Sequence, residues 1–387
     1  MSTGYIEKRG ENSWRLVCSG GYGPDGRRIK HTKTITTPNK RDAEKALAKL
    51  ITEIENGQVM NTKNLTFEEF IKRWLSEYAE RSLAPKTLAD YKQQLEYRVI
   101  PMLGRLKLDQ IKPLHLMKYY NHLRSENVRL DNRPGKLSEK TVLKNHMLIS
   151  SILQKAVNWQ MLHSNPARNV ERPKFIRKPV RYYNEDQLKK LFGNLKTAPL
   201  KYQTAVFIAV LCGVRLGELL GLEWGDIDFE KRSMVVQRAS QYLKERGLFT
   251  KMPKNQSSIR KVSISPLLVE ILVQYKEERN IEIKKVGSLW NKTDRLFTQW
   301  NGNPMHPSAV AQWFRKFLKR NSLDVINFHA LRHTSATMLI AKGVHPKTIS
   351  SRLGHANIST TMDIYGHALE STDRIAAEKL DEIINSN

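Results

Sequence analysis

Three β-prone runs open the chain, and apolar residues at helical spacing follow them. The runs are separated by Gly10 and by the loop 20–26, and they comprise Tyr5-Ile6, Trp14–Cys18 and His31–Ile35. A helix is then predicted from a cap at Asn39 to Gly57, with an apolar face of Ala43, Ala46, Leu47, Leu50 and Ile54. Residues 1–57 therefore predict a small domain in which one helix backs a three-stranded sheet.

Helical patterns continue from a polar linker at 58–64 to about residue 162. Prolines and glycines punctuate four apolar stripes: Phe67, Phe70, Ile71 and Trp74; Leu88, Tyr91, Leu95 and Val99; Met117, Tyr120 and Leu123; Val142, His146, Ile149, Ile152 and Leu153. Each stripe is interpreted as core. The pattern predicts a compact domain of four or five helices at 64–168.

A basic linker, Arg168–Lys178, precedes the last predicted domain, 175–387. The segment Asn184–Leu191 opens that domain. Helical patterns surround one predicted β region, formed by Ser233–Arg238 and Arg260–Ile264. The whole chain is therefore expected to have a multidomain α+β fold: a small sheet with a helix, an all-helical domain, and a mostly helical domain with a small sheet.

The net charge of +27 calls for a polyanionic partner, and nucleic acid is favoured over an acidic membrane surface. Acidic residues lie among the basic ones, which predicts folded basic faces rather than a basic tail. The candidate DNA-binding residues are Arg15, Arg27, Arg28, Lys30 and Lys33 in the first domain and Lys86, Lys92, Lys140 and Lys144 in the second. An ordinary solvated sheet face is the alternative for the first group.

The cysteines and the apolar runs argue against several classes of protein: disulfide-rich, zinc-binding, secreted and membrane-spanning. Cys18 and Cys212 are too few and too far apart for a disulfide framework or a zinc site. The N-terminus carries no apolar signal region, and the longest apolar run, Ala205–Val214, is about half of a bilayer span. We expect a soluble, cytoplasmic protein without a membrane partner or cofactor.

Five residues in the last domain have the chemistry to cut and rejoin a phosphodiester. Arg215 lies in an apolar run, where it needs a partner such as Glu218; a purely structural ion pair is the alternative. A planar guanidinium grips two phosphate oxygens at once, which also suits Arg332. Two histidines, His329 and His355, can move protons near neutral pH, and Tyr365 can take the phosphate covalently.

The surrounding pattern predicts two helices. One runs from His329 to Lys342 with Gly343 as its cap, and the other runs from Pro346 to Gly354, which places His355 just past it. A DNA-binding helix-turn-helix has the same outline, but it leaves His329, His355 and Tyr365 without a function.

Together these motifs resemble the tyrosine recombinase family, the phage-type integrases. The segment from Gly213 to Asp228, with Arg215, is similar to the family's first arginine box. His329-x-x-Arg332, Leu353-Gly354-His355 and Tyr365 are similar to its second box. The segment Pro253-Lys254, followed by Ser258 and Arg260, is similar to the hairpin that carries the family's catalytic lysine. Cys212 and Asn255 stand where the family commonly has threonine, and the second departure leaves Lys251 as an alternative to Lys254.

The resemblance implies a site-specific recombinase that integrates and excises a mobile element without metal or ATP. Tyr365 would form a 3′-phosphotyrosyl link, and the reaction would pass through a Holliday junction. Residues 1–57 would bind arm-type DNA sites and 64–168 core-type sites, in a bacterial host. Partners would be attachment-site DNA, three further copies in a tetramer, and accessory DNA-bending or excisionase proteins. The stripe Ile375, Ala376, Lys379, Leu380, Ile383 and Ile384 would dock on a neighbouring copy or on its own domain.

Three rival classes share parts of this pattern. A type IB topoisomerase has similar chemistry without choice of site, a helix-turn-helix repressor has no nucleophile, and a basic RNA-binding or structural protein accounts for the charge alone. The combined spacing of the two boxes favours the recombinase.

Overall fold

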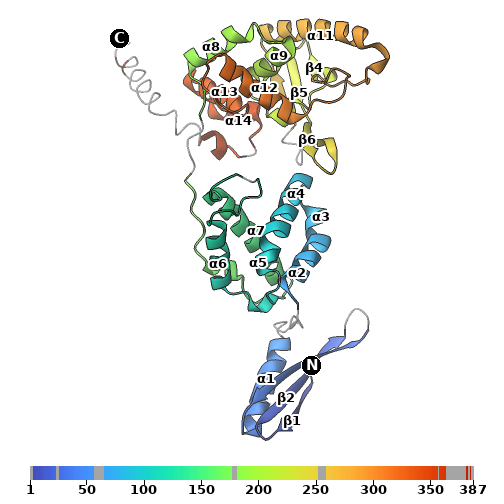
Figure 1. Ribbon diagram of the computed structural model, residues 1–387, viewed down its shortest axis with the longest axis vertical. Coiled ribbons are helices and arrows are strands. Elements are labelled where there is room, and N and C mark those ends of the chain that lie inside the picture. The colour runs from blue at the N-terminus through green and yellow to red at the C-terminus, as the bar shows by residue number, and fades with distance from the viewer. Residues whose placement is uncertain are drawn as a thin grey trace. The chain divides into compact units, whose positions relative to one another are not determined.

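The computed structural model describes residues 3–22, 26–55, 65–131, 133–176, 181–251, 259–355 and 357–362, with Asp381 and Ile384. The chain divides into two compact units, Met1–Arg177 and Lys178–Asn387 (Figure 1). Among the described residues, no helix combines the length and apolar character needed to cross a membrane.

The first unit begins with an antiparallel sheet in the order β1-β2-β3, with α1 packed on one face (Figure 1). The elements are β1 Gly4–Gly10, β2 Ser13–Tyr22, β3 Arg28–Thr36 and α1 Lys40–Glu55. Alternate residues of β2 point to α1 because successive strand side chains face opposite sides, so Trp14, Leu16 and Cys18 form a core with Ala43 and Leu50. The predicted strands and helix are confirmed.

Helices make up the rest of this unit. Two long helices each contain a π-helical turn, and two uninterrupted helices follow: α2 Phe67–Trp74, η1 Leu75–Ala79 and α3 Glu80–Ser82; α4 Pro85–Gln94, η2 Leu95–Val99 and α5 Ile100–Leu103; α6 Pro113–Leu123; α7 Glu139–Asn158. Short 3₁₀ turns lie at η3 Leu108–Gln110 and η4 Pro166–Asn169. Thr66 starts α2 through a reciprocal capping box with Glu69.

The helical core matches the predicted stripes, with two corrections. Phe67, Phe70, Ile71 and Trp74 are fully buried. Met117, which we expected in the core, is 49% exposed, because the buried face of α6 is formed by Leu116, Tyr119, Tyr120 and Leu123. Arg168, expected to begin a linker, lies in η4, where its neighbour Ala167 packs into the core.

The second unit is mostly helical around small sheets. Its helices are α8 Glu185–Leu195, α9 Leu200–Leu211, α10 Leu216–Leu219, α11 Pro266–Val286, α12 Pro307–Arg320, α13 Ala330–Ala341 and α14 Pro346–Leu353, with 3₁₀ turns η5 Trp224–Asp226 and η7 Gly287–Leu289. Helix α9 packs against both α11 and α13, which explains why it is apolar nearly all round. The predicted ends of α13 and α14 are confirmed.

The strands of this unit form two sheets. A three-stranded sheet has the order β4-β5-β8, formed by β4 Ile227–Asp228, β5 Ser233–Val236 and β8 Arg260–Ser263. A separate hairpin, β6 Ala239–Leu243 and β7 Gly247–Lys251, was not predicted from the sequence. The overall α+β class is confirmed.

Candidate active site

Arg215 begins α10 after a sharp change of chain direction. Helix α9 ends at Leu211, and Gly213 has a φ of +64°, where any Cβ would overlap the side chain of Leu353. The turn carries Arg215 out of the apolar run, and its side chain is 43% exposed. The apolar run around Arg215 predicted a buried side chain, and its partial exposure corrects that prediction.

The carboxylate of Glu218 holds Arg215 and Arg260 in place. It accepts hydrogen bonds from the backbone N–H of Arg215 at 2.9 Å and from Arg215 Nη1 at 2.7 Å. It also accepts one from Arg260 Nη2 at 2.7 Å. Burial opposes ionisation, but the hydrogen bond and charge of Arg260, together with Arg215, lower the pKa of Glu218 to about 2. The predicted ion pair with Arg215 is confirmed, and it extends to Arg260.

Arg332, in the first turn of α13, is the most buried of the three arginines. It is 3% exposed, and its Nη1 donates to the Gly213 carbonyl at 2.6 Å. Within the described residues, Nη2 has no hydrogen-bond partner. Burial and the charge of Arg215 lower the pKa of Arg332 to about 9, so it stays a cation at neutral pH. A buried cation with an unused donor is suited to receive an anion.

We call Arg215, Arg260, Arg332 and Glu218 the arginine cluster. The loop after α14 closes on it through Gly354, which has a φ of +69°. Arg215 Nη2 donates to the Gly354 carbonyl at 3.2 Å, and a Cβ on Gly354 would lie 2.8 Å from Arg260 Nη1. The absence of a side chain at Gly354 therefore lets the segment before His355 approach both arginines.

Two histidines border the cluster in their neutral form. Desolvation is the main cause that lowers the pKa of His329 to about 4, although the residue is exposed at one side of the site, and the neighbouring charges of His333 and Arg332 add to the shift. Partial burial, Arg332 and Arg215 lower the pKa of His355 to about 4. At neutral pH each ring therefore keeps one nitrogen able to accept a proton.

His355 is held by a residue that the sequence analysis did not single out. Its Nδ1 lies 2.8 Å from Oγ1 of Thr361, which is fully buried. If the hydroxyl donates this hydrogen bond, the proton of the neutral ring is on Nε2, which can then donate to a phosphate oxygen.

Lys254 and Tyr365, the predicted lysine and nucleophile, lie outside the described residues. Lys251, the alternative lysine, is the last residue of β7. The structure thus brings together Arg215, Arg332, His329 and His355 from the predicted set.

Arg260 was named from the sequence only as part of the hairpin motif, and its place in the site was missed. It lies on β8 and is 8% exposed, on the same face as Val262. A strand alternates its faces, so an arginine in phase with Val262 and Ile264 was the signal of a buried cation.

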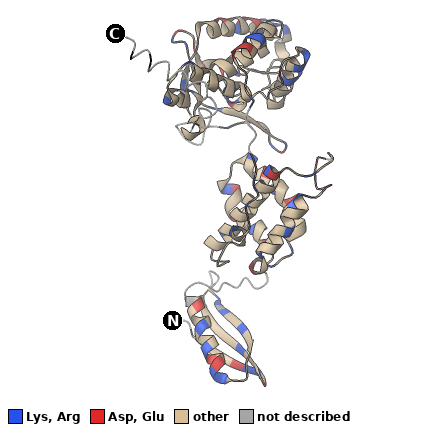
Figure 2. Cartoon of the chain, turned by 90° about the vertical axis from the view of Figure 1, so that its left-hand side faces the viewer, with Lys and Arg blue, Asp and Glu red and all other residues tan. Residues whose placement is uncertain are grey.

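Lys and Arg residues are spread over the elements of the first unit (Figure 2), and its candidate DNA-binding residues are mainly exposed. On the helices Lys86, Lys92, Lys140 and Lys144 are all exposed, and Lys92 also pairs with Glu80 at 2.7 Å.

In the sheet, the strand register separates the basic residues. Arg15 and Lys30 belong to the face opposite α1, Arg28 donates to Ser19, and Arg27 lies in the loop before β3. Lys33 is opposite Leu16, on the same face as α1, but it is exposed.

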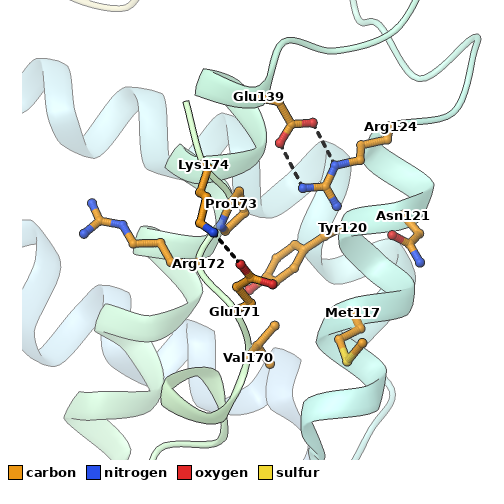
Figure 3. Close-up of a pocket in the computed structure, with 10 residues that line it drawn as sticks. All are labelled: Met117, Tyr120, Asn121, Arg124, Glu139, Val170, Glu171, Arg172, Pro173 and Lys174. Atoms are coloured by element: carbon orange, nitrogen blue, oxygen red, sulfur yellow. Dashed lines mark hydrogen bonds and ion pairs between the residues drawn. The ribbon is translucent and has the colours of Figure 1, made fainter. Parts of the chain in front are cut away.

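A separate pocket of about 370 Å³ lies among the helices of the first unit (Figure 3). Arg124 forms a two-pronged ion pair with Glu139 at 2.8 and 2.9 Å, and Lys174 pairs with Glu171 at 2.9 Å. Its acids and bases largely neutralise one another, unlike those of the arginine cluster.

Comparison with known proteins gives matches over nearly the whole chain. Residues 181–372 match the phage integrase family, and residues 66–124 match the phage integrase N-terminal SAM-like domain. A tyrosine recombinase XerC-like protein of Caldanaerobacter subterraneus subsp. tengcongensis is 30% identical, over 98% of each chain. The ICEBs1 integrase of Bacillus subtilis is 26% identical, over 98% of this chain and 100% of that protein.

Solved structures give the same fold. The Tn1549 transposon integrase in complex with transposon right end DNA superposes with a TM-score of 0.68 at 20% identity, covering 82% of this chain and 100% of that one. A lambda integrase dimer bound to a core site covers 93% of each chain, with a TM-score of 0.56 at 18% identity.

Proposed function

The chain belongs to the phage integrase family of tyrosine recombinases, and from that premise we propose how its residues perform the reaction. The protein is a site-specific DNA recombinase that cuts and rejoins DNA for a mobile element. The observation that supports our assignment of residues is the arginine cluster, in which a buried Arg332 has an unused donor beside Arg215 and two neutral histidines.

In the proposed cleavage step, the Tyr365 oxygen attacks the scissile phosphorus, and the bond from phosphorus to the 5′-oxygen breaks. The tyrosine proton passes to His329, which is neutral at physiological pH and can accept it. Lys254 donates a proton to the leaving 5′-oxygen. The products are a 3′-phosphotyrosyl link and a free 5′-hydroxyl, and the reverse reaction with a new 5′-hydroxyl rejoins the strand.

Charge on the non-bridging oxygens is stabilised by the two arginines that face them. Arg215 and Arg332 each offer N–H donors held in place before the reaction, which is the most effective arrangement for stabilising developing charge. His355, oriented by Thr361, donates to a phosphate oxygen.

Strand exchange requires more than one active site. We propose that four copies assemble on two DNA sites and exchange strands through a Holliday junction. Residues 1–57 bind arm-type sites, and 64–168 bind core-type sites. The contacts are supplied by Arg15, Arg27, Arg28, Lys30 and Lys33 in the first segment and by Lys86, Lys92, Lys140 and Lys144 in the second. Accessory DNA-bending or excisionase proteins set the direction, in the cytoplasm of a bacterial host. The C-terminal stripe, of which only Ile384 among its apolar residues is described, would dock on a neighbouring copy.

A trapping experiment tests this assignment. The protein is incubated without metal with an attachment-site duplex nicked next to the cleavage position, so that the 5′-hydroxyl diffuses away and the covalent adduct accumulates. We expect an adduct on a denaturing gel that is lost in Tyr365→Phe. Relaxation of a supercoiled plasmid lacking the site would instead favour a topoisomerase. Tight site binding without any adduct would favour a repressor.

A further inference from the structure

A second cationic feature lies beside the arginine cluster. A groove of about 570 Å³ runs between β8 and α14 in the second unit. We call it the cationic groove; its lining residues are Arg260, Lys261, Val262, Ser263, His345, Lys347, Thr348, Ser351 and Arg352. Four of these carry a fixed positive charge, three carry hydroxyls, and no acidic residue is among them.

The exposed cations of the groove are not used elsewhere in the described structure. Lys261 and Lys347 are both exposed, and neither forms an ion pair with a described residue. Ser263, Thr348 and Ser351 are exposed next to them. The groove also borders the first turn of α14, where the helix dipole favours an anion. Cations and hydroxyls in a concave surface match the oxygens of a phosphodiester.

Hydrogen bonds tie the walls of the groove to the catalytic residues. Arg352 Nη2 donates to the Leu211 carbonyl at 2.7 Å and to the Ser263 carbonyl at 3.0 Å, so it fixes α14 against α9 and β8. Arg260 lines the groove, donates through Nε to the Arg352 carbonyl at 2.9 Å, and pairs with Glu218, which also holds Arg215. One guanidinium thus belongs to both sites.

We propose that the cationic groove binds a backbone phosphate on the cleaved DNA strand, next to the scissile phosphate. This inference rests on the proposed function, because it places that strand across the arginine cluster. Lys261 and Lys347 hold the neighbouring phosphate, and the shared Arg260 keeps the two phosphate sites in register. Because the groove contacts a phosphate and no base, it positions the DNA strand without contributing to sequence specificity.

The test uses the full chain carrying Tyr365→Phe, so that binding is measured without cleavage. Lys261→Gln with Lys347→Gln is compared with Lys284→Gln with Lys285→Gln, two exposed lysines of α11 that do not line the groove. Loss of one phosphate contact should lower affinity about tenfold and reduce the slope of log K against log salt by about 0.9. The α11 control should change both much less. An unchanged slope in the groove variant overturns the proposal.

Single neutral methylphosphonates along both strands of the cleaved site then locate the contact. A methylphosphonate at one position next to the scissile phosphate should weaken DNA binding by the parent protein. It should not weaken binding by the groove variant, because that variant has already lost the contact. The placement is contradicted if methylphosphonates weaken the binding of both proteins equally at every position. It is also contradicted if the two proteins differ only at a position on the uncleaved strand. The proposed function is judged separately, on the unaltered protein with Tyr365, Lys261 and Lys347 all intact, by adduct formation on the nicked duplex. If this protein forms no adduct, the residue assignment fails; if it forms the adduct while the groove variant keeps the salt slope of its Tyr365→Phe parent, only the groove proposal fails.

Discussion

The arginine cluster of the second unit and the basic surface of the first unit use cations in opposite environments. Arg332 is 3% exposed and Arg260 is 8% exposed, and both are held by hydrogen bonds. Lys86, Lys140 and Lys144 are exposed at the surface. Buried, oriented donors can favour one phosphate geometry, whereas solvated lysines contribute affinity that falls with salt. The difference predicts that rate and affinity can be separated by mutation.

The largest expected effect comes from Arg332→Lys. Lysine keeps the charge but loses the planar fork, so the Gly213 contact and the open donor cannot both be kept. We expect single-turnover cleavage to fall by roughly 10²- to 10³-fold while DNA affinity changes little. Cleavage at the normal rate would show that Arg332 does not contact the transition state.

The matching change in the first unit is Lys86→Gln with Lys140→Gln and Lys144→Gln. With one phosphate per lysine, the salt slope of DNA binding should fall by about 2.7, and cleavage at saturating protein should stay near normal. Filter binding at several salt concentrations measures this. A slope equal to that of the unaltered protein would remove these three lysines from the DNA interface.

An intermediate effect is expected for Glu218→Gln, which leaves Arg215 and Arg260 without a compensating charge. The free energy of unfolding should drop by about 2 kcal/mol, because the buried Arg260 loses its ion pair. Glu230→Gln, at an exposed position, is the control. Calorimetry that finds the same loss for both variants would contradict the role of Glu218.

The smallest effect concerns acid stability. The pKa values of His329 and His355 fall from 6.5 to about 4 on folding, so between those pH values the unfolded chain binds more protons. Their contribution to stability is complete above pH 6.5 and is lost as the pH falls toward 4. The contribution of Glu218 is lost only between about 4.5 and 2. His355→Gln should flatten the urea-midpoint profile between pH 6.5 and 4; an unchanged slope would contradict the shift.

Local pattern predicted much of the fold and part of the site. Gly343 and Gly354, both in the left-handed region, marked the ends of α13 and α14, and the spacing of the apolar stripes marked the helical core. The arginine cluster depends on contacts that no local pattern contains. Arg260 pairs with Glu218 across 42 residues, and Arg332 reaches Gly213 across 119. The burial of Arg260 follows from those contacts and could not be assigned from the sequence, whereas Arg215 is exposed because the turn at Gly213 carries it out of the apolar run.

Buried arginines are expected to govern cleavage, and exposed lysines to govern binding. The most direct test measures the dissociation constant and the single-turnover cleavage rate on one nicked duplex, side by side, for Arg332→Lys and for the triple variant of Lys86, Lys140 and Lys144. We predict that the first loses rate and keeps affinity, and that the second loses affinity and keeps its rate at saturation. A parallel fall of both quantities in both variants would contradict the claim.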